Sequence, residues 1–204
     1  VLDWIKGLAT ERELEWKQDK AGNLVVYRPG SGGGEDAPPV CIQGHVDMVT
    51  EKSAGSKHDF LKDPIRLQRR GEWLAAQDTT LGSDNGIGVA AGLALLDSPP
   101  EEALPPLELL FTVAEEVGLV GAFDLDSELI AARTMLNLDT EEWPKVYFGC
   151  AGGGTTQIRL PVRRAPAPSA CDAAVEIVVG GLRGGHSGLN IGEGRGNAVL
   201  CCTR

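Results

Sequence analysis

Hydrophobic positions up to Asp139 predict helices and strands that follow one another in alternation. Apolar residues three or four apart, with charges between them, predict a helix over residues 1–17. A run rich in Ala and Gly, ended by two prolines, predicts a second helix over 85–96. Short apolar runs between turn-forming residues predict strands, of which 39–43 and 107–113 are expected to be buried. These strands cover residues 23–28, 39–43, 107–113 and 134–139, with a hairpin over 65–75 and a short helix over 120–123.

Strands that alternate with helices are typical of an α/β domain, in which a largely parallel sheet is flanked by helices. The pattern changes after Asp139, where a Gly-rich stretch at 150–154 predicts a hinge. Residues 156–160 and 174–179 then alternate apolar and polar side chains, as half-exposed antiparallel strands do. We therefore expect a first domain over 1–154 and the beginning of a smaller α+β domain over 155–204.

Composition and charge narrow the classes of partner. With 19 Lys and Arg against 29 Asp and Glu, the formal net charge is −10, which disfavours a nucleic-acid partner. No apolar run approaches the roughly 20 residues of a membrane helix, so we expect no membrane partner. The five cysteines form no CxxC pair, which favours reduced thiols and a cytoplasmic location. There is no initiator Met, and the last residues look like an unfinished helix, so we expect a fragment.

Acidic residues gather where the predicted strands end. Three predicted strands lead into acidic residues, and one more acid lies just before the second helix. Together with one histidine, these residues are His45, Asp47, Asp84, Glu115, Glu116 and Asp139. Reactive groups in parallel sheets collect beyond the carboxyl ends of the strands, so we expect these side chains to lie together. Each also has a purely structural interpretation: a surface pair for His45 and Asp47, a helix N-cap for Asp84, and a solvated loop for 115–116.

The donor chemistry of this set points to a metal. One imidazole and several carboxylates, without a thiolate, suit zinc, manganese or cobalt. His45 and Asp47 leave an extended segment on the same face, so the carboxylate can hold one ring nitrogen while the other binds a cation. Two cations sharing a carboxylate would lie about 3.5–4 Å apart and could activate water. A neighbouring glutamate would be the general base.

His186 is a further candidate, in the Gly-rich segment 184–188 of the second domain. A lone histidine is more often structural or exposed than catalytic. The surrounding glycines predict a turn that exposes the ring.

These motifs together resemble a known superfamily. Segments 43–49, 79–86, 112–116 and 137–139 are similar to those of the di-zinc aminoacylase/carboxypeptidase/dipeptidase metallopeptidases. Three further segments, 58–65, 121–123 and 149–153, look like the cytosolic aminoacyl-histidine dipeptidase branch, bacterial peptidase D. The resemblance covers nearly the whole chain, in the same order and with similar spacing.

The resemblance implies a role for each residue at the metal centre. His45 and Asp139 would bind one zinc, and Asp47 would orient His45. Asp84 would bridge both metals, with a cis peptide bond to the following Asn. Glu116 would bind the second metal.

It also implies a mechanism and an assembly. Glu115 would be the general base on a water held between two Zn²⁺ ions, for which Mn²⁺ or Co²⁺ are alternatives. The first domain would be catalytic and the second a lid and dimerisation domain. His186 would reach the active site of a partner subunit in a homodimer and help to hold the oxyanion.

The implied function is hydrolysis of dipeptides of the Xaa-His type in the cytoplasm. One alternative is an amidohydrolase that removes acyl groups from amino acids. Another is a truncated binding or dimerisation module without activity, because the superfamily's last metal ligand is a His beyond position 204. The second metal site of this chain is then one ligand short.

Overall fold

The computed structural model describes residues 1–140, 142, 144–150, 152, 154, 156–185, 190 and 192–203. They divide into two compact units, Val1–Val146 and Tyr147–Arg204. None of the helices in these ranges has the length and apolar character needed to cross a membrane.

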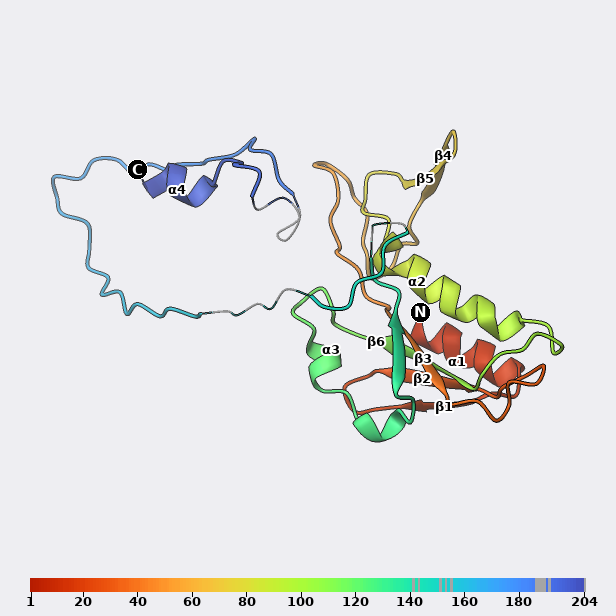
Figure 1. Cartoon of the computed structure of the whole chain (residues 1–204). Coiled ribbons are helices and arrows are strands. Elements are labelled where there is room, and N and C mark those ends of the chain that lie inside the picture. The colour runs from red at the N-terminus through yellow and green to blue at the C-terminus, as the bar shows by residue number, and fades with distance from the viewer. Residues whose placement is uncertain are drawn as a thin grey trace. The chain divides into compact units, whose positions relative to one another are not determined.

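The first unit is built on a five-stranded sheet in the order β1-β2-β6-β3-β7 (Figure 1). Its strands are β1 (Glu15–Gln18), β2 (Leu24–Arg28), β3 (Val40–His45), β6 (Leu107–Thr112) and β7 (Thr134–Asn137). β3 runs parallel to both β6 and β7. β1 and β2 form an antiparallel edge beside β6, which the expectation of a largely parallel sheet did not include.

Helices and a hairpin complete this unit. They are α1 (Leu2–Glu11), the pair β4 (Leu67–Arg70) and β5 (Trp73–Ala76), α2 (Ser83–Ala94), η1 (Leu95–Asp97), α3 (Val120–Phe123) and η2 (Ser127–Leu129). The mixed α/β class is as expected, with helices flanking the central strands.

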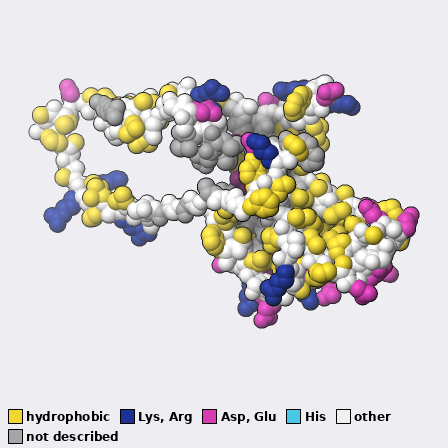
Figure 2. Space-filling model, in the orientation of Figure 1, with side chains coloured by type: hydrophobic (Ala, Val, Ile, Leu, Met, Phe, Trp, Pro, Cys, Tyr) yellow, Lys and Arg dark blue, Asp and Glu magenta, His cyan; other side chains and the backbone are white. Residues whose placement is uncertain are grey.

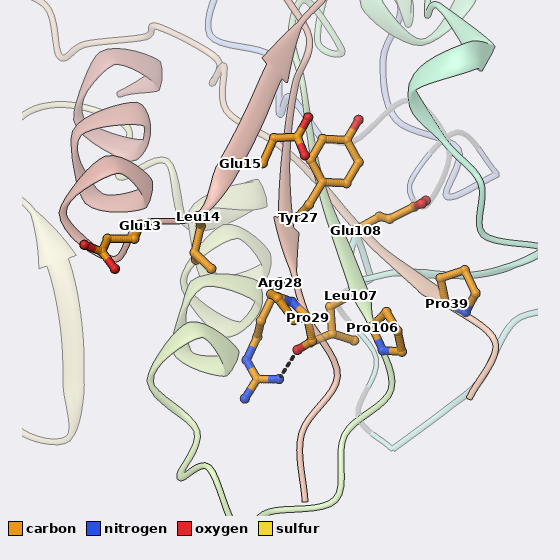
Figure 3. Close-up of a pocket in the computed structure, with 10 residues that line it drawn as sticks. All are labelled: Glu13, Leu14, Glu15, Tyr27, Arg28, Pro29, Pro39, Pro106, Leu107 and Glu108. Carbon is orange, nitrogen blue, oxygen red and sulfur yellow. Dashed lines mark hydrogen bonds between the residues drawn. The ribbon is translucent and has the colours of Figure 1, made fainter. Parts of the chain in front are cut away.

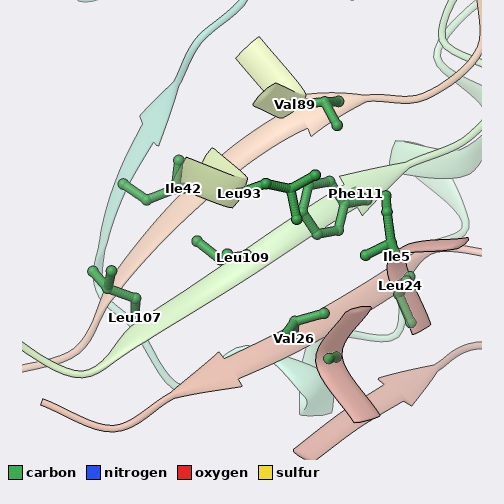
Figure 4. Close-up of a cluster of buried hydrophobic side chains, with 10 residues drawn as sticks. Ile5, Leu24, Val26, Ile42, Val89, Leu93, Leu107, Leu109 and Phe111 are labelled. Atoms are coloured by element: carbon green, nitrogen blue, oxygen red, sulfur yellow. The ribbon is translucent and has the colours of Figure 1, made fainter. Parts of the chain in front are cut away.

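Both faces of the central strands are covered. Alternate residues of a strand point to opposite faces, and in β2 the side chains of Val25 and Val26 are fully buried on different sides. On one face α1 and α2 pack against β2, β3 and β6 (Figure 4). The opposite face is covered by Leu125, Leu129 and Ile130. Burial of each large core side chain contributes about 1.5–3 kcal/mol, which holds β3 and β6 in register.

The predicted helix over 1–17 is wrong in its last part. α1 ends at Glu11, the chain turns at Glu13 with a φ of 55°, and β1 follows. β1 is exposed along its length but pairs antiparallel with β2. The edge of β2 offers backbone N–H and C=O groups with which residues 15–18 can pair. Because the helical pattern of side chains carries no information about this partner, strand pairing overrides the local periodicity here.

The second unit contains one regular element among its described residues, α4 (Ala198–Thr203). The strands predicted over 156–160 and 174–179 are wrong, since these residues form no strand. Alternation of apolar and polar residues makes a strand only when a neighbouring strand takes up its backbone N–H and C=O groups. Ile158 and Leu160 of this unit are exposed. Figure 2 shows hydrophobic side chains at the surface in yellow. The domain assignment of 1–154 and 155–204 stays a prediction.

Cys41 in β3 is expected to resist thiol reagents in the folded protein. Its side chain is fully buried, and burial, with the nearby charge of Glu108, raises the pKa of the thiol to about 12. Iodoacetamide at pH 8 is expected to alkylate the four exposed cysteines and to spare Cys41 until denaturant is added. Peptide mapping by mass spectrometry measures this, and rapid native labelling of Cys41 would contradict the burial of β3.

The same thiol makes stability depend on pH. The unfolded chain loses this proton near pH 9, whereas the folded chain keeps it up to about 12. The free energy of unfolding is therefore expected to fall as pH rises through that window. The decrease should be smaller in Cys41→Ala, measured by urea unfolding at each pH.

Candidate metal centre

The candidate residues lie at one edge of the sheet because their strands run in the same direction. His45 is the last residue of β3 and pairs in register with Thr112, the last residue of β6. Glu115 and Glu116 follow β6, and Asp139 follows β7, the other parallel neighbour of β3. Three loops therefore meet beyond the carboxyl ends of these strands, as the α/β pattern predicts.

His45 is the centre of the arrangement, and its side chain is only 1% exposed. Its Nε2 atom lies 3.0 Å from Asp84 Oδ1, 3.8 Å from Asp139 Oδ2 and 3.9 Å from Glu115 Oε2. Among the residues that the structure describes, two groups of donor atoms have all their members within 4.8 Å of one another. They are His45, Asp84 and Asp139, and His45, Glu115 and Glu116. The structure thus brings together five of the predicted residues, and Asp47, the sixth, lies beside them.

Asp47 makes two kinds of contact. Its backbone carbonyl lies 2.9 Å from His45 Nδ1, and its carboxylate lies 3.5 Å from the same nitrogen. The carboxylate also accepts the backbone N–H groups of Glu115 and Glu116, each at 3.1 Å. Asp47 therefore ties the loop after β3 to the loop after β6. Sequence reasoning missed this second contact, because no motif marks a backbone N–H that lies 68 residues away.

Asp84 does not cap α2, which corrects one structural interpretation. The helix begins after Gly82, whose φ is 77°, and no side chain caps it. Asp84 has a non-helical ψ of 108°, and its carboxylate faces His45 instead. The peptide bond between Asp84 and Asn85 is cis, which confirms that expectation. The buried Asn85 donates from Nδ2 to the carbonyl of Leu138 at 2.9 Å, joining α2 to the chain before Asp139.

The electrostatics fit a bound cation. Burial opposes the charge of His45, but its hydrogen bond to Asp84 and the nearby carboxylates leave its pKa above the ordinary value. Burial, followed by the neighbouring acids, raises the pKa of Glu115. Burial and the charge of Asp84 likewise raise the pKa of Asp139. Carboxylates crowded around one imidazole repel one another, and a divalent cation among them would remove that repulsion. The donor set therefore suits a divalent metal.

His186 lies outside the described residues. A pocket of about 370 Å³ lies at the opposite edge of the sheet, between the end of β2 and the starts of β3 and β6 (Figure 3). Arg28 in this pocket donates to the carbonyl of Pro29. None of the predicted site residues lines it.

Comparison with known proteins gives two close relatives. The chain is 41% identical over 198 residues to the cytosol non-specific dipeptidase of Escherichia coli K12, a match that covers 97% of this chain and 40% of the relative. It is 37% identical to the solved structure of an aminoacylhistidine dipeptidase from Vibrio alginolyticus, with a TM-score of 0.70, over 96% of this chain and 39% of that one.

A more distant structure shares the fold alone. A tripeptidase from Staphylococcus aureus is 24% identical, with a TM-score of 0.57, over 69% of this chain and 37% of that protein. No protein-family model matches the chain. The resemblance seen in the motifs is confirmed: this chain is homologous to a cytosol non-specific dipeptidase and to an aminoacylhistidine dipeptidase, and it spans about two fifths of the length of each.

Proposed function

We propose that the protein hydrolyses dipeptides of the Xaa-His type with the help of two divalent cations, and that zinc is the preferred metal. The observation that carries this proposal is the convergence of carboxylates on the buried Nε2 of His45. The names of the two close relatives, both dipeptidases, support the substrate class.

The proposed ligands divide between two cations. His45 and Asp139 would hold the first, Glu116 the second, and Asp84 would be shared, as its position 3.0 Å from His45 Nε2 allows. Asp47 would keep His45 in place through Nδ1. The cations would lower the pKa of water and polarise the scissile carbonyl.

Glu115 would move the proton. Its raised pKa, caused first by burial and then by its acidic neighbours, suits a carboxylate that accepts a proton and later releases it. It would take a proton from the attacking water and deliver it to the leaving amine. Its backbone N–H is held by Asp47, which limits the directions in which the side chain can point.

Several parts of the proposal rest on the resemblance. These are a lid and dimerisation domain over 155–204, a homodimer in which His186 reaches the partner's site to hold the oxyanion, and a cytoplasmic location. The last is supported by the word cytosol in the name of the Escherichia coli relative.

The test is a substrate panel run with metal analysis on the full-length protein. Xaa-His dipeptides, other dipeptides and N-acyl amino acids are offered to the enzyme loaded with Zn²⁺, Mn²⁺ or Co²⁺. We expect dipeptides to be cleaved with two cations bound per chain. Preference for N-acyl amino acids would favour the deacylase alternative. A chain that binds no cation and cleaves nothing would favour the non-catalytic module.

A further inference from the structure

Asn23 is a buried polar side chain just before β2, with no exposed surface. Its Nδ2 donates to Asp19 Oδ2 and to the carbonyl of Gly121, both at 2.8 Å. Its Oδ1 accepts the backbone N–H of Val113 at 3.2 Å. Both protons of the amide and its oxygen are therefore used.

The two backbone groups held by Asn23 are the two ends of one loop. This loop, residues 113–121, carries Glu115 and Glu116. Its ends also meet directly, since Gly121 donates its N–H to the carbonyl of Val113 at 3.1 Å. The approach is so close that a Cβ on Gly121 would lie 2.1 Å from Val113 O and 2.7 Å from Asn23 Oδ1.

Asn23 is itself held in one orientation. The carboxylate of Asp19 accepts the backbone N–H groups of Gly22 and Asn23, each at 2.8 Å, as well as the Asn23 side chain. Asp19 of the β1–β2 turn thereby fixes the Asn23 side chain, whose other two hydrogen bonds reach the loop. Two polar side chains therefore hold loop 113–121. The Asp47 carboxylate accepts the backbone N–H groups of its acidic residues, and the Asn23 side chain bonds to backbone groups at both of its ends.

We propose that Asn23 is a positioning residue for Glu115 and Glu116. Without its amide, Val113 N–H would lose its side-chain acceptor and Gly121 C=O its side-chain donor, and buried polar groups left unpaired are costly. The loop would shift to recover hydrogen bonds, and both carboxylates would move relative to His45. The proposal rests on the proposed function in assigning Glu116 to a cation and Glu115 to proton transfer.

The test compares Asn23→Leu with two matched controls. Leucine is similar in size but makes no hydrogen bond. Gln18→Leu removes a bond to the same turn, from Gln18 Nε2 to the carbonyl of Gly22, without touching the loop. Val26→Ala weakens the core of the same strand away from the loop. Each variant is titrated with Zn²⁺ by calorimetry, and hydrogen exchange of the Glu115 and Glu116 amides is measured without metal.

We expect Asn23→Leu to lower Zn²⁺ affinity by about 10–100-fold, which is the usual effect of removing a group that orients the metal ligands. The amides of Glu115 and Glu116 should exchange faster in this variant and at the wild-type rate in both controls. Unchanged affinity and exchange in Asn23→Leu, or equal losses in Val26→Ala, would overturn the proposal and leave Asn23 a general stabiliser.

A second variant covers the case in which Asn23→Leu does not fold. Gly121→Ala disturbs the same junction from the opposite side, because its Cβ meets the carbonyl of Val113. A folded Gly121→Ala with faster exchange at both amides supports the proposal, and wild-type exchange overturns it. If the wild-type protein binds no Zn²⁺, the proposed function fails, while amide exchange still decides the role of Asn23.

Discussion

Replacing Glu115 with glutamine is expected to slow dipeptide hydrolysis by about 10²–10⁴-fold, the usual contribution of a general base. The amide keeps the shape of the side chain but cannot take a proton from water. Cation content should stay close to the wild-type level, because Glu115 is proposed as a base and not as a ligand. Steady-state kcat/KM and metal analysis on the same samples measure the two quantities.

Glu116→Gln is the matched control, since Asp47 holds the backbone of both residues in the same way. This variant should lose cation affinity and recover rate as the cation concentration rises. Near-normal turnover of Glu115→Gln at saturating metal would remove Glu115 from the mechanism. Equal cation affinity in the two variants would contradict the division of roles between them.

His186→Ala is expected to lower kcat by about 10²–10³-fold without changing cation content, if the ring donates to the developing oxyanion. The proposed ligands belong to the first unit and His186 to the second. The ring can take part only if the second unit carries it to a metal centre. Turnover of the full-length variant at saturating substrate gives the size of the effect, and unchanged turnover would exclude the role.

Mixed dimers separate the two geometries. Chains with His186→Ala are combined with chains carrying Glu115→Gln, neither of which has a complete site alone. If His186 acts in the partner's site, a mixed dimer contains one centre with both residues intact, and activity returns. If it acts within its own chain, no centre is complete and activity stays low.

Much of the first unit could be predicted from local patterns. β3, β6 and β7 are short apolar runs, and the central strands are buried on both faces, so their hydrophobic residues are continuous. The prediction failed where hydrogen-bond partners decide the structure. Residues 15–18 form β1 because β2 offers a free edge, whereas residues 156–160 alternate as a strand does and yet form none.

The sequence by itself determined which donors are available and where they lie along the chain. The position of His45, Glu115 and Asp139 at or just after strands was enough to predict a shared edge, because parallel strands end on the same side. The resemblance to the dipeptidase superfamily also implied the cis bond after Asp84. These features are local, or repeat a pattern of the homologues, so no contact between distant segments was needed to find them.

Only the tertiary structure decided which atoms meet. The order β6-β3-β7 brings the carboxylates of Glu115 and Asp139 within 4 Å of His45 Nε2, and no local pattern encodes that order. Local patterns are equally silent about the hydrogen bonds from the amides after β6 to the Asp47 carboxylate, and about those that join Asn23 to the ends of that loop. Periodicity records which face of an element is buried, but a hydrogen bond between distant residues depends on how the elements pack.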